Sequence, residues 1–259
     1  MKIVTVGNTV FEIVTRGDTL LATQPGGSAM NLSVSLARSN VDVHFYTSFG
    51  DDLLGSSIRQ FFVQNRISTE YAVIQGQTNV TVGKLNGSEA TYEKFKTVQD
   101  YPVFDFSRSI GADLIMITGS YVISGPKALL DNILAFSSKY AIPIYFDPNP
   151  RSPLQNTHFN TLLDHCMYFR VSEDDLKYIP DFHLQNGAVF IQTNPNQVTA
   201  KLNQIQTTVL CPKITPVCTI GAGDAFNAGF CSAEGTFEER IKNGVDYAQR
   251  VCMKFEPFI

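Results

Sequence analysis

Side chains that bind metal ions or form disulfides are scarce in this sequence. The four histidines are scattered and form no HxH or HExxH unit, which disfavours a zinc site. The five cysteines show neither a CxxC spacing nor an even count, so we interpret them as free thiols in a reducing cytosol. They are Cys166, Cys211, Cys218, Cys231 and Cys252.

Long apolar runs and an excess of positive charge are also missing. No segment reaches about 18 consecutive apolar residues, so no membrane-spanning helix is expected. Residues 1–6 open directly into an alternating strand pattern, and we therefore expect no signal peptide and a cytoplasmic protein. The net charge of −4 and the pI of about 5.6 leave no broad basic surface for nucleic acid or an anionic membrane.

Short apolar runs alternate with longer segments of helical periodicity along most of the chain. The expected strands are residues 2–6, 42–47, 113–117, 142–147, 167–171 and 188–192. The expected helices are residues 29–39, 52–64, 125–139, 153–163, 172–178, 225–233 and 237–254. Strands that are apolar throughout and alternate with helices predict an α/β fold with a mostly parallel central sheet covered on both faces.

Two segments show strand alternation with turns between the strands instead. Residues 11–23 turn at Arg16-Gly17-Asp18, and residues 71–96 turn at Asn86-Gly87-Ser88. Hairpins of this kind predict a small, solvent-facing antiparallel sheet outside the main one. We interpret it as a small flap within a single domain that spans residues 1–259.

A glycine-rich turn before a helix of small residues is the strongest chemical signal. In Gly221-Ala222-Gly223-Asp224 the glycines permit a sharp turn with exposed amides. At a helix N-terminus such amides bind an anion, for example a phosphate under attack. Asp224 then lies beside the anion, where a carboxylate can accept the proton of an attacking hydroxyl. Taken alone, such a motif is more often an ordinary turn whose Asp begins a helix.

A second glycine-rich segment precedes the first expected helix. Gly26 and Gly27 permit a ligand to approach the backbone closely, and Asn31 can both donate to and accept from hydroxyl groups. The alternative is a loop in which the glycines only cap the helix and the Asn only packs.

Together, in this order and near the two ends of the chain, the two segments resemble the signatures of the PfkB/ribokinase family of carbohydrate kinases. The resemblance implies a ribokinase-like three-layer sandwich with a β-lid over the sugar, and ATP and Mg²⁺ as cofactors. It implies Asp224 as the catalytic base and the Gly221, Ala222 and Gly223 backbone as an anion hole. By the same likeness, the substrate is held by Glu12, Gly26, Gly27, Asn31 and Arg151.

The segment Asp147-Pro148-Asn149-Pro150-Arg151 resembles the DPNxR stretch of fructokinase-like members. There it lies by substrate and phosphate, so Arg151 would stabilise a transferring phosphoryl group. Alternatively, the prolines form a rigid turn with Arg151 in solvent. The likeness also places the nucleotide against Asn149, Gln192 and Asn194.

Several positions depart from the family pattern. Glu12 stands where an aspartate often grips the sugar, and Cys218 replaces the usual aspartate before Thr219. The metal-associated NxxE motif is represented by Ser172 and Asp175, which retain oxygen ligands for Mg²⁺ on shorter side chains. The nucleotide-binding TxGxxG turn lacks both glycines, and Asn194 is expected to keep the turn by adopting a positive φ.

The sequence therefore predicts ATP-dependent phosphorylation of a sugar hydroxyl by a fructokinase-like enzyme, acting as a monomer or homodimer. Two alternatives stay open at this point. One is a catalytically silent protein that binds a sugar or nucleotide. The other is a kinase whose acceptor is a nucleoside, a sugar acid or a glycated amino acid such as a fructosamine.

Overall fold

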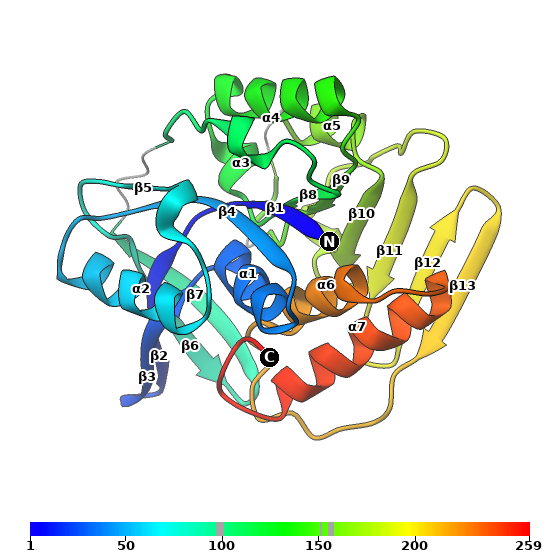
Figure 1. Ribbon diagram of the computed structural model, residues 1–259. Coiled ribbons are helices and arrows are strands. Elements are labelled where there is room, and N and C mark those ends of the chain that lie inside the picture. Colours follow the sequence, from blue (N-terminus) through cyan, green and yellow to red (C-terminus); the bar gives the residue numbers. More distant parts are fainter. Residues whose placement is uncertain (97–100, 151, 155–157) are drawn as a thin grey trace.

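A large sheet with helices on both faces forms the body of the protein in this computed structural model (Figure 1). Residues 1–96, 101–150, 152–154 and 158–259 are described. The nine strands run in the order β13-β12-β11-β10-β9-β8-β1-β4-β5. Their bounds are β1 Lys2–Val6, β4 Asp42–Phe49, β5 Ala72–Ile74, β8 Leu114–Thr118, β9 Ile144–Asp147, β10 Tyr168–Ser172, β11 Val189–Thr193, β12 Gln197–Leu202 and β13 Ile205–Leu210.

The expected parallel sheet is confirmed over seven of these strands. The hairpin of β12 and β13 is added at one edge, where β12 runs antiparallel to both β11 and β13. That hairpin was not predicted, because its exposed residues are mostly polar and carry no continuous apolar run. Residues 72–74, which the sequence had suggested for the lid, join the main sheet beside β4.

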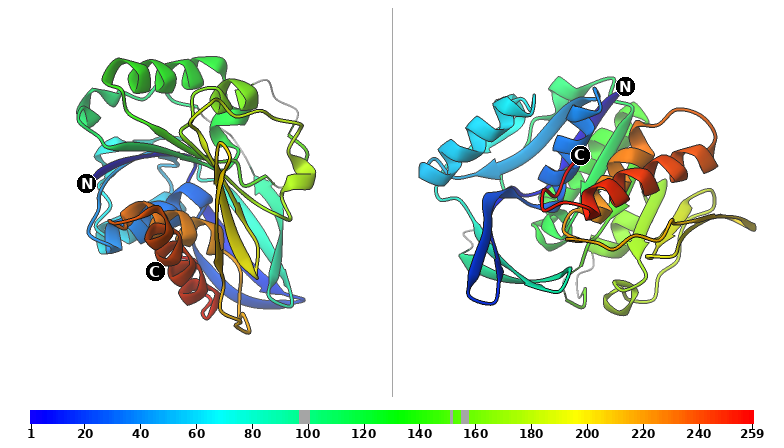
Figure 2. Two further views of the ribbon diagram at one scale, coloured as in Figure 1. Left: turned by 90° about the vertical axis from the view of Figure 1, so that its right-hand side faces the viewer. Right: turned by 90° about the horizontal axis from the view of Figure 1, so that it is seen from below.

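Helices cover the two faces of the sheet and complete a three-layer sandwich (Figure 2). One face carries α1 Ser28–Arg38, α2 Leu53–Gln64, α6 Ala222–Ser232 and α7 Phe237–Cys252. The other carries α3 Tyr121–Ser124, α4 Lys127–Tyr140 and α5 His158–Leu163. Short 3₁₀ turns are η1 Thr69–Tyr71, η2 Phe106–Ser109 and η3 Leu176–Tyr178. The expected helix at 172–178 is wrong, since β10 continues to Ser172 and only the turn η3 follows.

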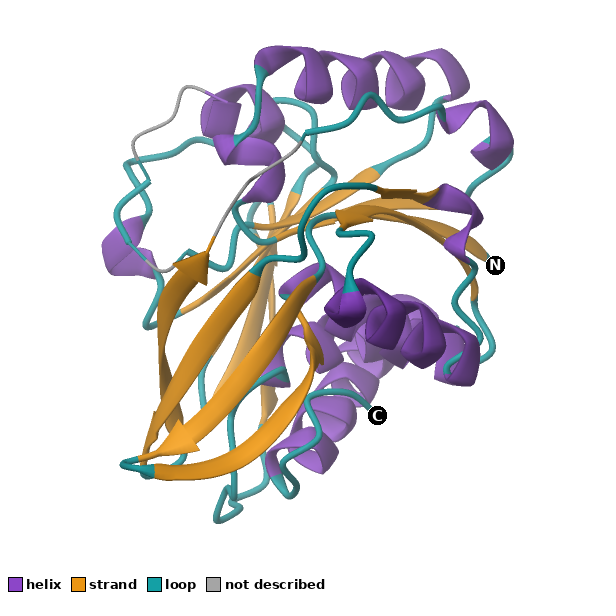
Figure 3. Cartoon of the chain, turned by 90° about the vertical axis from the view of Figure 1, so that its left-hand side faces the viewer, coloured by secondary structure: helices purple, strands orange, loops and turns teal. Residues whose placement is uncertain are grey.

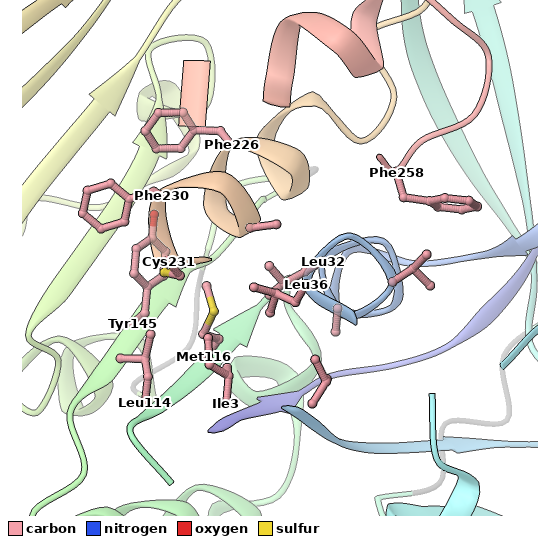
Figure 4. Packing of buried hydrophobic residues seen from close by; sticks show 14 of the residues in the cluster. Ile3, Leu32, Leu36, Leu114, Met116, Tyr145, Phe226, Phe230, Cys231 and Phe258 are labelled. Atoms are coloured by element: carbon pink, nitrogen blue, oxygen red, sulfur yellow. The ribbon is translucent and has the colours of Figure 1, made fainter. Parts of the chain in front are cut away.

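Alternate side chains of each central strand enter two separate cores. Ile3 of β1 packs towards α1, whereas Val4 and Val6 belong to the core under α4. Figure 4 shows the first core, in which Met116 and Tyr145 from the strands face Leu32 of α1 and Phe230 of α6. Strands buried on both faces lack polar alternation, which is why they were recognisable as a parallel sheet.

The second sheet contains four strands and stands beside α1 (Figure 3). We call it the lid sheet. Its order is β3-β2-β6-β7, with bounds β2 Val10–Arg16, β3 Thr19–Gly26, β6 Val80–Asn86 and β7 Glu89–Lys96. Both predicted hairpins are present, and a parallel β2–β6 pair joins them. In the described part of the chain, no helix is both long and apolar enough to cross a membrane.

Candidate active site

Two helix N-termini meet at the edge of the main sheet where the parallel strands end. The Ser28 hydroxyl at the start of α1 donates to Asp224 Oδ1 at 2.5 Å. The Asn31 amide, one turn later on α1, donates to Asp224 Oδ2 at 3.0 Å. Asp224 itself is only 4% exposed in the first turn of α6. Both oxygens of this carboxylate are therefore oriented by a helix almost 200 residues away in the chain.

One polar atom of the Asn31 side chain is available to bind a ligand. Its side chain is buried, and its nitrogen is used by Asp224, but its Oδ1 has no hydrogen-bond partner among the described residues. Leaving a buried carbonyl oxygen without a donor is costly, so a bound hydroxyl is its natural partner. Ser28 was not predicted for the site. Its spacing of three residues from Asn31 on one helical face was the available signal.

The turn before α6 has the geometry that an anion site requires. Gly221 caps the helix in the left-handed region, with φ 79°. A Cβ at this position would lie 2.1 Å from the Pro257 carbonyl oxygen, so both conformation and space demand glycine. The Ala222 amide donates to Thr219 O at 3.2 Å. The amides of Gly223 and Asp224 lie in the first turn of α6, where the helix itself offers them no acceptor, so they suit a bound anion.

A buried arginine lies directly beneath this turn. Arg170, in the middle of β10, is 7% exposed, and its Nη1 would be 2.7 Å from a Cβ placed on Gly223. Its guanidinium donates to Asp147 Oδ2 at 2.9 Å and to Thr193 Oγ1 at 2.5 Å. Burial is the largest single influence and lowers the pKa of the Arg170 guanidinium, but the charge of Asp147 and the other raising interactions together outweigh it, so the pKa lies above its ordinary value. The site therefore contains a permanent positive charge.

Sequence analysis missed Arg170, although a signal for it exists. A charged residue in the middle of a strand predicted to be buried on both faces requires a partner or a ligand. Asp147 is that partner, and it also accepts from Asn227 Nδ2 of α6 at 2.7 Å. Tyr145 completes the network by donating to Asn227 Oδ1 at 2.8 Å. The network thus connects β9, β10, β11 and α6 under the anion turn.

The segment after β9 carries two of the predicted residues. Asn149 has a positive φ of 38°, and its amide donates to Asp147 Oδ1 at 3.0 Å. This places Asn149 next to the buried Arg170–Asp147 pair. Arg151 lies outside the described residues.

The predicted metal and nucleotide residues lie at the ends of β10 and β11. The Ser172 hydroxyl donates to Asp175 Oδ2 at 2.6 Å, so these two predicted metal ligands are in contact. Gln192 lies next to Thr193, the residue that binds Arg170. Among the described residues, no three His, Cys, Asp or Glu side chains gather as a direct metal-binding group.

Asn194 keeps the β11–β12 turn by a different means from the one expected. Its φ is not positive; instead, its Oδ1 accepts from the amides of Asn196 and Gln197, each at 2.8 Å. Its Nδ2 donates to Glu173 Oε2 at 2.9 Å. An asparagine side chain therefore forms this turn in place of glycines.

Glu12 and the glycine pair are close together at the base of the lid sheet. Glu12 is 5% exposed, and a Cβ on Gly26 would lie 2.2 Å from Glu12 Cδ. Gly27 has φ 109° and would place a Cβ 2.8 Å from Asn8 O. The glycines therefore let the start of α1 approach Glu12 and the end of β1 closely. Gly26 and Gly27 both lie within a few residues of Ser28 and Asn31 in the chain.

Comparison with known proteins gives a consistent result. The profile described as pfkB family carbohydrate kinase matches residues 19–256. The chain is 23% identical over 242 residues to a ribokinase of Bacillus subtilis (84% of this chain, 78% of the relative). It is 24% identical over 257 residues to a fructokinase of Klebsiella pneumoniae (88% and 82%).

Solved structures share the fold at lower identity. A 2-dehydro-3-deoxygluconokinase from Thermotoga maritima superposes with a TM-score of 0.84 at 16% identity, covering 100% of this chain and 94% of that one. A sugar kinase from Pyrococcus horikoshii, in complex with ATP, superposes with a TM-score of 0.82 at 18% identity, covering 97% and 92%. The ribokinase-like fold predicted from the sequence is thereby confirmed.

Proposed function

Because the chain belongs to the pfkB family of carbohydrate kinases, we propose that it transfers the γ-phosphoryl group of ATP to a hydroxyl of a free sugar, with Asp224 as the general base. One observation carries this proposal. The Asp224 carboxylate is fixed by Ser28 and Asn31 at the N-terminus of α6, beside the amides of Gly223 and Asp224. A base and an anion site are thus adjacent, as transfer to a hydroxyl requires.

Each group of the site has a task in this reaction. Asp224 accepts the proton of the acceptor hydroxyl while the hydroxyl oxygen bonds to the γ-phosphorus and the bond from that phosphorus to the bridging β-phosphate oxygen breaks, so that ADP leaves. The amides of Gly223 and Asp224 stabilise charge on the phosphoryl oxygens, and Arg170 adds a buried positive charge behind them. Bound ATP supplies the phosphoryl group, and Mg²⁺ neutralises part of the phosphate charge. Arg151 is proposed to assist on the phosphate side, as the DPNxR likeness implies.

The residues on the nucleotide side fit Mg²⁺ and ATP. Kinase sites usually hold Mg²⁺ through one or two carboxylates and several waters. Ser172 and Asp175, already in contact, provide a hydroxyl and a carboxylate for such water-mediated binding. Asn149, Gln192 and Asn194 would line the nucleotide at the ends of β9 and β11. The buried Arg170 suits the phosphates.

Unpartnered polar atoms near Asp224 favour an acceptor rich in hydroxyl groups. Asn31 Oδ1 and Thr118 Oγ1 are buried without a hydrogen-bond partner in the described part of the chain. Gly119, next to Thr118, would place a Cβ only 3.6 Å from that of Ser28. Glu12, Gly26 and Gly27 would complete the sugar pocket. The fructokinase and ribokinase relatives support a free monosaccharide as the acceptor class.

The test is an assay of ADP release with Mg·ATP against a panel of acceptors. The panel contains fructose, other hexoses, pentoses, sugar acids, nucleosides and fructosamines. We expect turnover with a free sugar, and we expect Asp224→Asn to lower kcat at least about a hundredfold while sugar binding is retained. The matched control is Asp246→Asn, which removes an exposed carboxylate on α7 and should leave turnover unchanged.

The outcomes separate the alternatives. Near-normal turnover of Asp224→Asn would refute its role as the base. Turnover with a nucleoside or fructosamine alone would support kinase activity but replace the free sugar by that acceptor. Tight ligand binding without ADP release across the whole panel would favour a binding protein.

A further inference from the structure

The tip of the lid sheet is bound to the residue that precedes the anion turn. Ser88, in the β6–β7 turn, presents its carbonyl oxygen to Thr219. The Thr219 amide donates to this oxygen at 2.9 Å, and the Thr219 hydroxyl donates to it at 3.0 Å. The second hairpin turn joins the same contact, because Arg16 Nη2 donates to Gly87 O at 3.2 Å. The β6–β7 turn therefore binds Thr219 directly, and the β2–β3 hairpin supports that turn through Arg16.

A small apolar cluster reinforces this contact. Val14 and Leu85 of the lid sheet pack against Cys218 and Ile220, the two neighbours of Thr219, and all four are buried. Leu21, Ala22, Ala90 and Tyr92 of the lid pack around them. We call Val14, Leu85, Cys218 and Ile220 the lid cluster. It is separate from the two cores of the main sheet.

The opposite side of the same segment rests on the C-terminal part of the chain. The amides of Val217 and Cys218 donate to Cys252 O at 2.8 and 3.3 Å. Gly221 lies against the Pro257 carbonyl, as described above. Residues 217–221 are therefore held between a fixed support and the lid tip. Thr219 O also accepts the Ala222 amide at 3.2 Å, so the position of Thr219 determines how the anion turn begins.

We propose that Thr219 is a positioning residue that makes the lid tip part of the anion hole, so that undocking the lid loosens the Gly221–Gly223 turn. The proposal adds to the function proposed above, and it rests on that function only for the role of the anion as phosphate. Opening the lid then removes two hydrogen bonds and the lid cluster from one side of the turn. Phosphoryl transfer becomes coupled to closure over the acceptor, which limits transfer to water.

Hydrogen exchange measured by mass spectrometry tests this coupling without any turnover. The two segments to compare are residues 84–90 of the lid tip and residues 217–222 of the anion turn. Thr219→Val removes the hydroxyl but keeps the amide and the side-chain shape. We expect it to raise exchange in both segments about threefold to tenfold, the effect of one lost hydrogen bond on a local opening. Thr219→Ser, which keeps the hydroxyl, should restore values near those of the unchanged protein.

A second pair of variants acts from the lid side. Leu85→Ala truncates a lid-cluster residue and should raise exchange in residues 217–222 as well as in its own hairpin. Leu20→Ala makes the same truncation at an exposed lid position and should change neither segment. Melting temperatures confirm that each variant is folded.

Faster exchange in one segment without the other, in either Thr219→Val or Leu85→Ala, would overturn the proposal. The result does not depend on the kinase assay. Silence of the enzyme with every acceptor would refute the proposed function and leave the coupling of lid and turn as measured.

Discussion

At the scale of single residues, the candidate base is defined by donors from another helix. Ser28 and Asn31 each donate a hydrogen bond to one oxygen of Asp224. The carboxylate is therefore held in place and does not rotate freely about the side-chain bonds of Asp224. A carboxylate fixed in this way loses little entropy when it meets an acceptor hydroxyl. The substitution of Asp224 described above is therefore a test of chemistry, because an asparagine can keep both contacts: its oxygen accepts from Asn31, and its amide nitrogen donates to the Ser28 hydroxyl.

Arg170 permits a second prediction at this scale. Its planar guanidinium reaches Asp147 and Thr193 at once, which a lysine ammonium cannot do with the same geometry. We expect Arg170→Lys to lower kcat by about tenfold to a hundredfold while the protein remains folded. The measurement is steady-state kinetics with the accepted sugar, together with a thermal melt.

The matched control is Arg240→Lys. Arg240 is also partly buried, donates to Phe230 O at 3.1 Å and lies over the Phe230 ring, but it is not part of the candidate site. Its variant should keep wild-type turnover. Equal turnover in the Arg170 and Arg240 variants would show that the reaction does not need the planar guanidinium that reaches Asp147 and Thr193 together.

The same residues show what the sequence can and cannot predict. Asp224, Asn31 and the glycines were selected correctly as neighbours, because a motif made of consecutive residues can be recognised directly in the sequence. Ser28 and Arg170 were missed although each carries the signal described above, because their partners depend on which strands and helices the fold brings together. Hydrogen bonds across 193 and 196 residues have no local signature.

At the scale of elements, the crossing of α6 and α7 depends on two glycines. A Cβ on Gly229 of α6 would lie 2.7 Å from Asn243 O and from Tyr247 Cγ, and a Cβ on Gly244 of α7 would lie 2.8 Å from Phe226. The two helices therefore approach each other closely, with no room for a side chain at either glycine. This contact fixes α6, and with it the anion turn, against the rest of the domain.

The sign of the stability change in Gly229→Ala distinguishes the effect of close packing from that of helix propensity. Propensity alone predicts that alanine stabilises the helix by about 1 kcal/mol. Because the methyl group would clash with backbone, we expect a loss of about 1–3 kcal/mol in the free energy of unfolding, measured by urea denaturation. The control Ser232→Ala, near the end of the same helix, should change stability by less than about 0.5 kcal/mol. A gain in stability for Gly229→Ala would contradict the close crossing.

Elements were predicted well where periodicity was strong and poorly where it was not. The six buried parallel strands were found within about two residues of their bounds, because each is an uninterrupted apolar run. The β12–β13 hairpin carries polar residues on its exposed face and was not recognised. The helix expected at 172–178 was wrong because the side chains of Ser172 and Asp175 hydrogen-bond to each other and form a turn in place of a helix.

At the scale of the whole molecule, a buried histidine makes stability depend on pH. His44 is 6% exposed, stacks on Tyr71 and binds Ser109 Oγ through Nδ1 at 2.8 Å. Burial lowers the pKa of His44 below its ordinary value of 6.5; the charge of Asp42 acts in the opposite direction. The folded state therefore binds fewer protons than the unfolded state, and stability is lost as pH falls from about 6.5 through the lowered pKa.

The measurement is the melting temperature of wild type and His44→Gln between about pH 7.5 and about pH 5. We expect a smaller acid-induced drop in the variant, which cannot be protonated in this range. His183→Gln removes an exposed histidine and should retain the full drop. Equal pH dependence in wild type and His44→Gln would assign the acid sensitivity to other groups.

The order of strands in the main sheet also has a consequence for synthesis on the ribosome. The strand β1 lies in the middle of the sheet, between β4 and β8, and its pairing with β8 joins residues 3–6 to residues 114–117. At ordinary translation rates, about 5–20 s pass between the emergence of these two strands. During that interval one edge of an apolar strand is open to other nascent chains. The N-terminal third of this kinase is thus the segment that we expect chaperones to protect first.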